Sequence, residues 1–100
     1  MLETARHYEF KANLIAANAP RTSGLYALFQ GAGILLIGES DNIFASLMDH
    51  LHGRGPSASA VSAFAYEVCS PERRRIRHRE LVFRYKPAYT DRPELKLREL

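Results

Sequence analysis

The sequence predicts a single α+β domain, in which a small three-stranded antiparallel sheet opens with a β-hairpin and is flanked by helices. Three observations carry this prediction. The length of 100 residues is that of one domain. Two apolar runs separated by Gly31-Ala32-Gly33 are typical of a hairpin, and two stretches with helical spacing begin at capping signals. We expect a core over about residues 10–90, followed by a tail or short helix over 91–100.

The first part of the chain predicts one helix and two strands. Residues 8–18 carry apolar side chains at helical spacing, and Pro20 lies just beyond them. The strands are expected over 25–30 and 34–39, with Gly31 and Gly33 supplying positive φ angles to a three-residue loop. Both runs are nearly continuous in apolar residues, so we expect at least one strand to be covered on both faces.

A second helix is expected over residues 42–52, with Ser40 or Asp41 as its cap and Gly53 at its end. A polar connection then leads to a third strand over residues 61–69, where apolar side chains alternate.

The next helix begins at Ser70-Pro71 and is expected to end before Pro87. Its apolar positions recur at three- and four-residue spacing and include His78, which we therefore place on the side of the core. A last short helix from Pro93 is the alternative to a loose tail.

The charge of the chain is uneven along its length. Residues 1–70 hold four Lys/Arg and six Asp/Glu, whereas residues 71–100 hold ten and five. A basic segment of this kind attracts DNA or RNA by releasing counterions, although a solvated helix face has the same composition. The only cysteine, Cys69, excludes an internal disulfide and indicates a reducing, cytoplasmic setting. No apolar run approaches the roughly 20 residues of a membrane span, so no membrane partner is expected.

Two short triplets carry the sequence's chemical signal. Gly24-Leu25-Tyr26 lies on the first hairpin strand and Leu36-Ile37-Gly38 on the second. A polar turn and a helix with His50 follow, and Lys86-Pro87-Ala88-Tyr89 ends the last long helix. In this order and spacing the chain resembles the GIY-YIG nuclease module from about Phe10 to Thr90.

The resemblance implies a chemistry and also marks what is missing from it. In that family a tyrosine attacks or activates water at a phosphodiester, an arginine steadies the phosphate and a glutamate holds a divalent metal. The resemblance makes Tyr26, His50 and His78 the catalytic candidates. Four family positions are substituted here: the second tyrosine by Leu36, the helix arginine by Ser46, the metal glutamate by His78 and the terminal asparagine by Thr90. Mg²⁺ or Mn²⁺ is implied only if the protein cleaves, and no metal ligand set is assigned.

Each catalytic candidate also has a structural interpretation. Tyr26 fits a half-buried strand aromatic, His50 a surface helix histidine, and His78 a buried imidazole with its hydrogen bonds satisfied. A set of His50, His78 and Cys69 has zinc-type side chains but lacks a recognisable zinc spacing.

Four arginines are candidates for phosphate contact: Arg54, Arg73, Arg74 and Arg77. Arg54 follows the second helix on a polar loop, and the other three lie on a helix whose arginines spread over several faces.

The sequence thus leaves three functions open. The first is nucleic-acid association with weak or no cleavage. The second is a divergent metal-dependent DNA endonuclease using Tyr26, and the third is a protein-interaction or homodimer module. The oligomeric state is not determined by the sequence.

Overall fold

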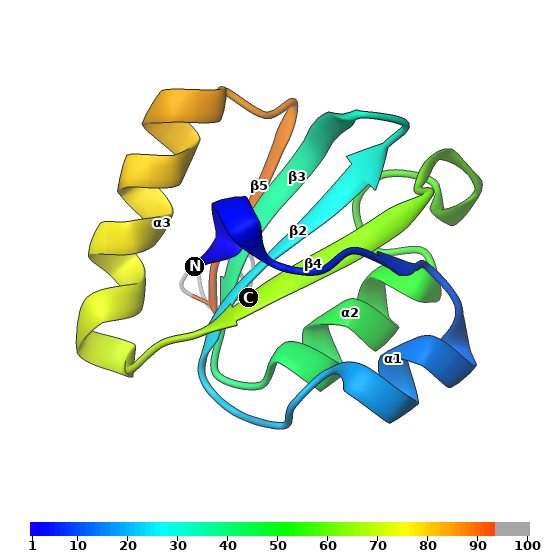
Figure 1. The fold of residues 1–100 in the computed structure, drawn as a ribbon, viewed down its shortest axis with the longest axis horizontal. Helices are drawn as coiled ribbons and strands as arrows, with labels where there is room; N and C mark the ends of the chain where they lie inside the picture. Colours follow the sequence, from blue (N-terminus) through cyan, green and yellow to red (C-terminus); the bar gives the residue numbers. More distant parts are fainter. Residues whose placement is uncertain (94–100) are drawn as a thin grey trace.

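The computed structural model describes residues 1–93, which form a five-stranded sheet with helices on both faces (Figure 1). The strand order is β1 (Tyr8–Glu9), β4 (Ala63–Val68), β2 (Gly24–Gln30), β3 (Gly33–Ser40) and β5 (Tyr89–Asp91). Helices α1 (Ala12–Asn18) and α2 (Ile43–Leu51) lie on one face, and α3 (Pro71–Tyr85) lies on the other. Two 3-10 turns, η1 (Leu2–Thr4) and η2 (Ala58–Ala60), complete the described elements. The predicted α+β class is confirmed.

The central strand β2 is buried on both of its faces. Tyr26 and Leu28 pack in the cluster beneath α1 and α2, whereas Leu25, Ala27 and Phe29 pack with Leu81 of α3. This arrangement confirms the expectation drawn from the continuous apolar run, because a strand between two layers has no polar face.

The hairpin turn between β2 and β3 is tighter than predicted. Gly31 takes a positive φ of 61°, but Gly33 is already the first residue of β3 and has no positive φ. The loop is therefore Gly31-Ala32, and only its first glycine uses the freedom of a missing side chain. A register shift between Leu28 and Phe29 marks a bulge before the turn.

Both edge strands were absent from the predicted three-stranded sheet. Tyr8–Glu9, expected within the first helix, pairs antiparallel with β4. Asp91, expected in the tail, is the last residue of β5, which runs parallel to β3. Strands of two and three residues are too short to show a period-two pattern, and pairing with an existing strand fixes them. The short helix predicted from Pro93 would occupy residues that lie outside the described part of the chain.

The helix termini follow their capping residues. Asn42, rather than Ser40 or Asp41, caps α2, since its side chain accepts from the amide of Ala45 at 3.0 Å. Ser70 caps α3 with Pro71 as its first residue. As predicted, α3 ends before Pro87, at Tyr85.

Candidate functional site

Tyr26, the tyrosine of the first triplet, belongs to a row of three residues paired across neighbouring strands. Tyr26 of β2 pairs with Gly38 of β3, and Gly38 pairs with Asp91 of β5. The Tyr26 ring lies across Gly38, where a Cβ atom would come within 2.6 Å of Cε1 of the ring. The glycine of the second triplet therefore leaves the space through which the Tyr26 hydroxyl reaches Asp91.

Helix α2 supplies the third member of this group. The Tyr26 hydroxyl lies 2.8 Å from Nε2 of His50 and donates to Oδ2 of Asp91 at 2.6 Å. Nδ1 of His50 lies 2.8 Å from the carbonyl oxygen of Arg54, which only accepts, so Nδ1 carries a proton. The single hydroxyl hydrogen goes to Asp91. Nε2 of His50 lies within hydrogen-bond distance of the same hydroxyl oxygen and 3.4 Å from Oδ2 of Asp91.

Arg54 lies on the solvent side of the group formed by Tyr26, His50 and Asp91. Its guanidinium forms an ion pair with Oδ1 of Asp91 and lies 3.7 Å from a carboxylate oxygen of Asp49. The Arg54 side chain is 27% exposed, whereas that of Asp91 is 10% exposed. The arginine thus stands between the buried carboxylate and the solvent.

The surroundings set the protonation of the two acidic groups. Burial raises the pKa of Tyr26 well above its usual value of 10.0, and the Asp91 charge and hydrogen bond raise it further. Burial by itself raises the pKa of Asp91, but hydrogen bonds from His50 and Tyr26 and the charge of Arg54 outweigh it and hold that pKa below 3.8. The phenol therefore stays neutral beside a carboxylate that stays ionised. With no exposed surface, Tyr26 is closed to a substrate.

The substituted family positions bring no replacement charge to this group. Leu36 is buried in the apolar cluster below the sheet. Ser46 is also buried, and its hydroxyl lies 2.6 Å from that of Ser40. In the described part of the chain, Asp91 is the carboxylate in contact with Tyr26, and Arg54 already engages it. These residues do not fit Mg²⁺, which takes several oxygen ligands.

A pocket of about 330 Å³ opens at the rim of the site. Its lining includes His50, Arg54, Tyr89 and Asp91. Tyr89 pairs in register with Leu36 and is 45% exposed. Tyr89 and Arg54 therefore stand at the open edge of the site. Tyr89 lies on the strand next to Leu36, where the family resemblance places a tyrosine. Arg54 lies in the loop after α2, the helix on which the resemblance places an arginine.

The structure does not bring His78 to Tyr26, because the sheet separates them. His78 lies on the α3 side, where Nε2–H donates to the carbonyl oxygen of Ile37 at 2.9 Å. Its Nδ1 lies 3.6 Å from Oε2 of the buried Glu39. Burial lowers the pKa of His78 below its usual 6.5. The expected position of His78 on the core side is confirmed.

The four arginine candidates fall into different environments. Arg74 is buried, and its guanidinium contacts Glu39 at 3.3 Å and Asp41 at 2.6 Å. Arg77 forms ion pairs with Glu67 and Glu3; they raise the pKa of its guanidinium, with the Glu67 hydrogen bond contributing most. These two guanidinium groups hold α3 against the sheet and the N-terminal turn.

Arg73 is exposed at the start of α3, beside Cys69, and lies apart from the Tyr26 group. Within residues 1–93, no three His, Cys, Asp or Glu side chains are arranged to hold a metal ion. In that same part of the chain no helix is long and apolar enough to cross a membrane.

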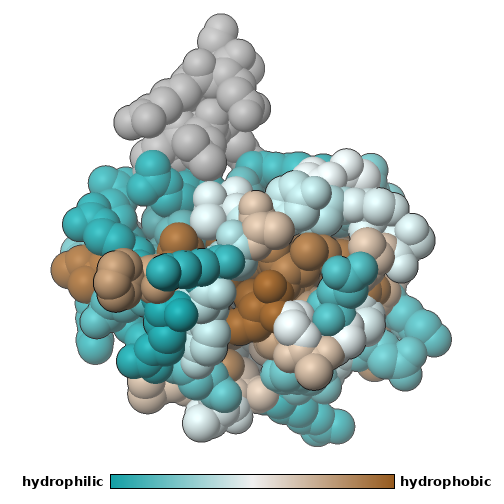
Figure 2. Space-filling view, turned by 90° about the horizontal axis from the view of Figure 1, so that it is seen from above, coloured by the Kyte–Doolittle hydropathy of each residue, from teal (hydrophilic) through white to brown (hydrophobic). Residues whose placement is uncertain are grey.

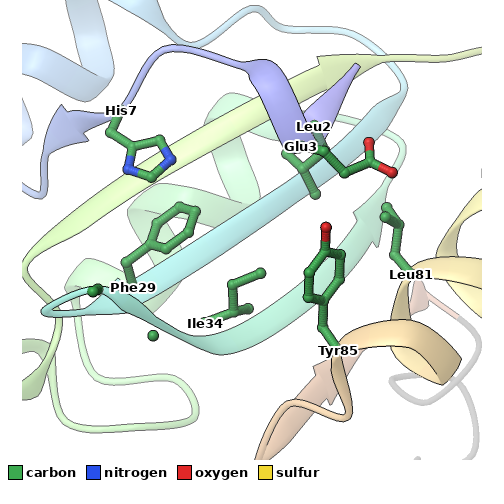
Figure 3. A pocket seen from close by; sticks show the side chains of 9 residues that line it. Leu2, Glu3, His7, Phe29, Ile34, Leu81 and Tyr85 are labelled. Carbon is green, nitrogen blue, oxygen red and sulfur yellow. The ribbon is translucent and has the colours of Figure 1, made fainter.

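A hollow of about 360 Å³ lies on the α3 side of the sheet and contains none of the predicted site residues. Figure 3 shows its lining, with His7 over Phe29 and the Tyr85 hydroxyl directed between the N-terminal turn and α3. Figure 2, which views the molecule from above, shows hydrophobic residues gathered in the middle of the face seen in that view, with hydrophilic residues around them.

Sequence reasoning missed Asp91 and Tyr89. Counting from the family frame led to Thr90, which is exposed, whereas its neighbour Asp91 carries the contact to Tyr26. Alternation within a strand places Tyr89 and Asp91 on one face, and a strand assignment for these residues would have identified both.

Comparisons with known proteins place this architecture. No protein-family model matches the chain, and a search of curated proteins finds no relative. Solved structures of the GIY-YIG N-terminal endonuclease domain of UvrC from Thermotoga maritima do match. The magnesium-bound domain has a TM-score of 0.65 at 20% identity, over 76% of this chain and 90% of that one. Two point mutants of that domain, each bound to the catalytic divalent cation, match similarly. One has a TM-score of 0.67 at 16% identity, over 77% of this chain and 91% of that one. The other has a TM-score of 0.66 at 17% identity, over 76% of this chain and 89% of that one. The chain therefore has the GIY-YIG endonuclease fold.

Proposed function

We propose that this protein associates with nucleic acid and cleaves it weakly or not at all. The observation that carries the proposal is the state of the Tyr26 hydroxyl. It is buried, it donates to Asp91 and it lies 2.8 Å from Nε2 of His50. A catalytic oxygen must reach the phosphorus atom and must lose its proton at or before attack. Here the hydroxyl is enclosed, and its raised pKa opposes ionisation.

Two features support a nucleic-acid partner. The solved domains that this chain resembles are endonuclease domains. The last 30 residues also hold an excess of five positive charges, from ten Lys/Arg against five Asp/Glu. Arg73 and Arg79 are exposed on α3, where a phosphate backbone can approach them.

A cleavage assay tests the first half of the proposal. The purified protein is incubated with supercoiled and branched DNA in Mg²⁺ or Mn²⁺, beside a Tyr26→Phe variant. We expect no cleavage above that of the variant. Efficient cleavage that disappears in Tyr26→Phe would overturn the proposal in favour of a divergent endonuclease.

A salt titration tests the second half. Binding of labelled DNA and RNA is measured by fluorescence anisotropy at increasing salt. Because phosphate contacts release counterions, we expect the affinity to fall steeply as salt rises. Absence of binding at low salt would leave the protein-interaction or homodimer module as the remaining function.

One observation favours the divergent endonuclease as a second candidate, with the rim rather than a metal ion supplying the charge. Arg54 and Tyr89 stand at the open rim of the site and offer the charge and the hydroxyl that Ser46 and Leu36 do not. If the protein cleaves, Arg54→Ala and Tyr89→Phe should each reduce cleavage while the protein stays folded. Cleavage unchanged in both variants would exclude the rim from the reaction.

A further inference from the structure

A groove of about 390 Å³ lies between α3 and β5, outside the Tyr26 site. Its lining consists of His78, Arg79, Val82, Phe83, Thr90 and Arg92. We propose that this groove binds single-stranded nucleic acid, with Phe83 stacking on a base and Arg79 and Arg92 facing the phosphates. The inference rests on the proposed nucleic-acid association and assigns it a surface.

Phe83 is the first element of the argument. It is 79% exposed, the largest exposed fraction among the bulky hydrophobic residues of the described chain. Its neighbour in the groove lining, Val82, is partly buried against the core, whereas the Phe83 side chain is left largely exposed. An exposed aromatic ring in this position offers a free π-face to a flat ligand.

Positive charge surrounds this ring. Arg79 and Phe83 are four residues apart and thus adjacent along one side of α3. Arg92, just after β5, also lines the groove, and the Thr90 hydroxyl adds a hydrogen-bonding group. The lining, taken over the described residues, includes no carboxylate. A surface that pairs an aromatic ring with guanidinium groups complements a base next to a phosphate.

The same features select the form of the ligand. In a duplex the faces of the bases are covered by their neighbours, so a protein ring stacks on them only after they separate. In a single strand the faces are available, and stacking accepts any base. The exposed ring of Phe83 therefore favours an unpaired strand over a duplex, and the cationic lining favours a polyanion over an apolar partner.

The groove is also independent of the closed tyrosine site. Asp91 directs its carboxylate to Tyr26, on the face covered by α2. The groove lies on the α3 side, where His78 forms part of its floor. A strand bound there leaves the Tyr26–Asp91 contact in place, which agrees with association without cleavage.

Substitutions at Phe83 separate aromatic stacking from apolar contact. Phe83→Leu keeps an apolar side chain but removes the ring, whereas Phe83→Tyr keeps the ring. Ile76→Ala is the matched control, because Ile76 is also exposed on α3, at 63%, and does not line the groove. Both positions are exposed enough for the three variants to fold normally.

Charge is tested in the same way. Arg79→Ala removes a positive charge from the groove, and Arg73→Ala removes the same charge from the other end of the same helix. Binding is measured by anisotropy of labelled oligothymidine, oligouridine of the same length and a duplex. The first two probes distinguish DNA from RNA as the source of the strand.

The proposal predicts a graded result. Phe83→Leu should weaken single-strand binding roughly 5- to 100-fold, since stacking on one base is lost. Arg79→Ala should weaken binding and reduce its salt dependence. Phe83→Tyr and Ile76→Ala should bind like the unaltered protein, and Arg73→Ala should lose less than Arg79→Ala.

Other results would distinguish a failure of the groove assignment from a failure of the proposed nucleic-acid association. If the unaltered protein binds but Phe83→Leu and Arg79→Ala bind equally well, the groove assignment is overturned and nucleic-acid association stands. Equal affinity for duplex and single strand, with no effect of Phe83→Leu, also overturns it. If the unaltered protein binds none of the probes at low salt, the proposed function itself fails and this inference falls with it.

Discussion

The substitution Tyr26→Phe tests whether the first tyrosine holds the fold together. It removes only the hydroxyl, which contacts both Nε2 of His50 and Oδ2 of Asp91. His50 is 1% exposed and Asp91 is 7% exposed, so water does not readily replace the lost partner. Arg54 still pairs with Asp91, and Nε2 of His50 lies 3.4 Å from Oδ2 of Asp91. The expected loss is therefore that of one buried hydrogen-bonding group, about 2 kcal/mol.

Urea unfolding followed by far-ultraviolet circular dichroism measures this loss, because the chain has no tryptophan for fluorescence. The midpoint should fall without a change in slope. For a domain of this size, a loss of about 2 kcal/mol lowers the melting temperature by roughly 8–16 °C.

The matched control is Tyr66→Phe. Tyr66 pairs with Tyr26 across β4 and β2 and is partly buried, and no hydrogen bond of its hydroxyl is seen in the described chain. We expect its removal to change stability by less than about 0.5 kcal/mol. Equal, small effects of the two substitutions would refute the buried network, and Tyr26 would then be free for another role.

Three further predictions concern the residues around this network. Gly38→Ala places a methyl group against the Tyr26 ring, so we expect a loss of about 1–3 kcal/mol or more in urea unfolding, and an unchanged midpoint would contradict the close approach. Arg74→Met leaves Glu39 buried without its guanidinium partner, and thermal unfolding should show a loss of about 3–5 kcal/mol; a loss below 1 kcal/mol would mean that Glu39 is solvated. The lowered pKa of His78 means that the unfolded chain binds its proton more readily, so the unfolding free energy should fall as pH drops below 6.5, and His78→Leu should flatten this dependence between pH 7.5 and 5.

The hairpin illustrates how far periodicity reaches. Its two strands appear in the sequence because each holds a run of four or five consecutive apolar residues, and the glycine pair marks the turn. The residue that starts β3 was misplaced, since Gly31 and Gly33 are equally able to take a positive φ and only strand pairing decides between them. The sequence predicts that strands of this length exist, but it does not predict the exact residues at which they begin and end.

The two edge strands, β1 and β5, are too short to be predicted from hydrophobic periodicity. Tyr8 was placed in a helix by spacing, but it stacks on Phe64, with ring centroids 5.3 Å apart, and pairs with β4. A segment of two residues has no period of its own, so its conformation comes from the strand beside it. The same reason placed Asp91 in a tail when it belongs to β5.

The arginines of α3 show a similar division. Their number and the start of the helix at Ser70 follow from the sequence, as does the core-facing position of His78. Which arginine is buried does not follow, because Arg73 and Arg74 are chemically alike and adjacent. Arg74 faces Glu39, a carboxylate 35 residues earlier that strand alternation turns toward α3.

The sequence by itself determined the class of fold, the two triplets, and which side chains stand at the positions that the family resemblance marks: Leu36, Ser46 and His78. Each of these depends on residue identity and short-range spacing. Only the tertiary structure decided the state of Tyr26, because its partners His50 and Asp91 lie 24 and 65 residues away. Bringing them together requires α2 to pack on the sheet and β5 to pair with β3. Those contacts, rather than the triplets, make Tyr26 a buried, neutral hydrogen-bonding group.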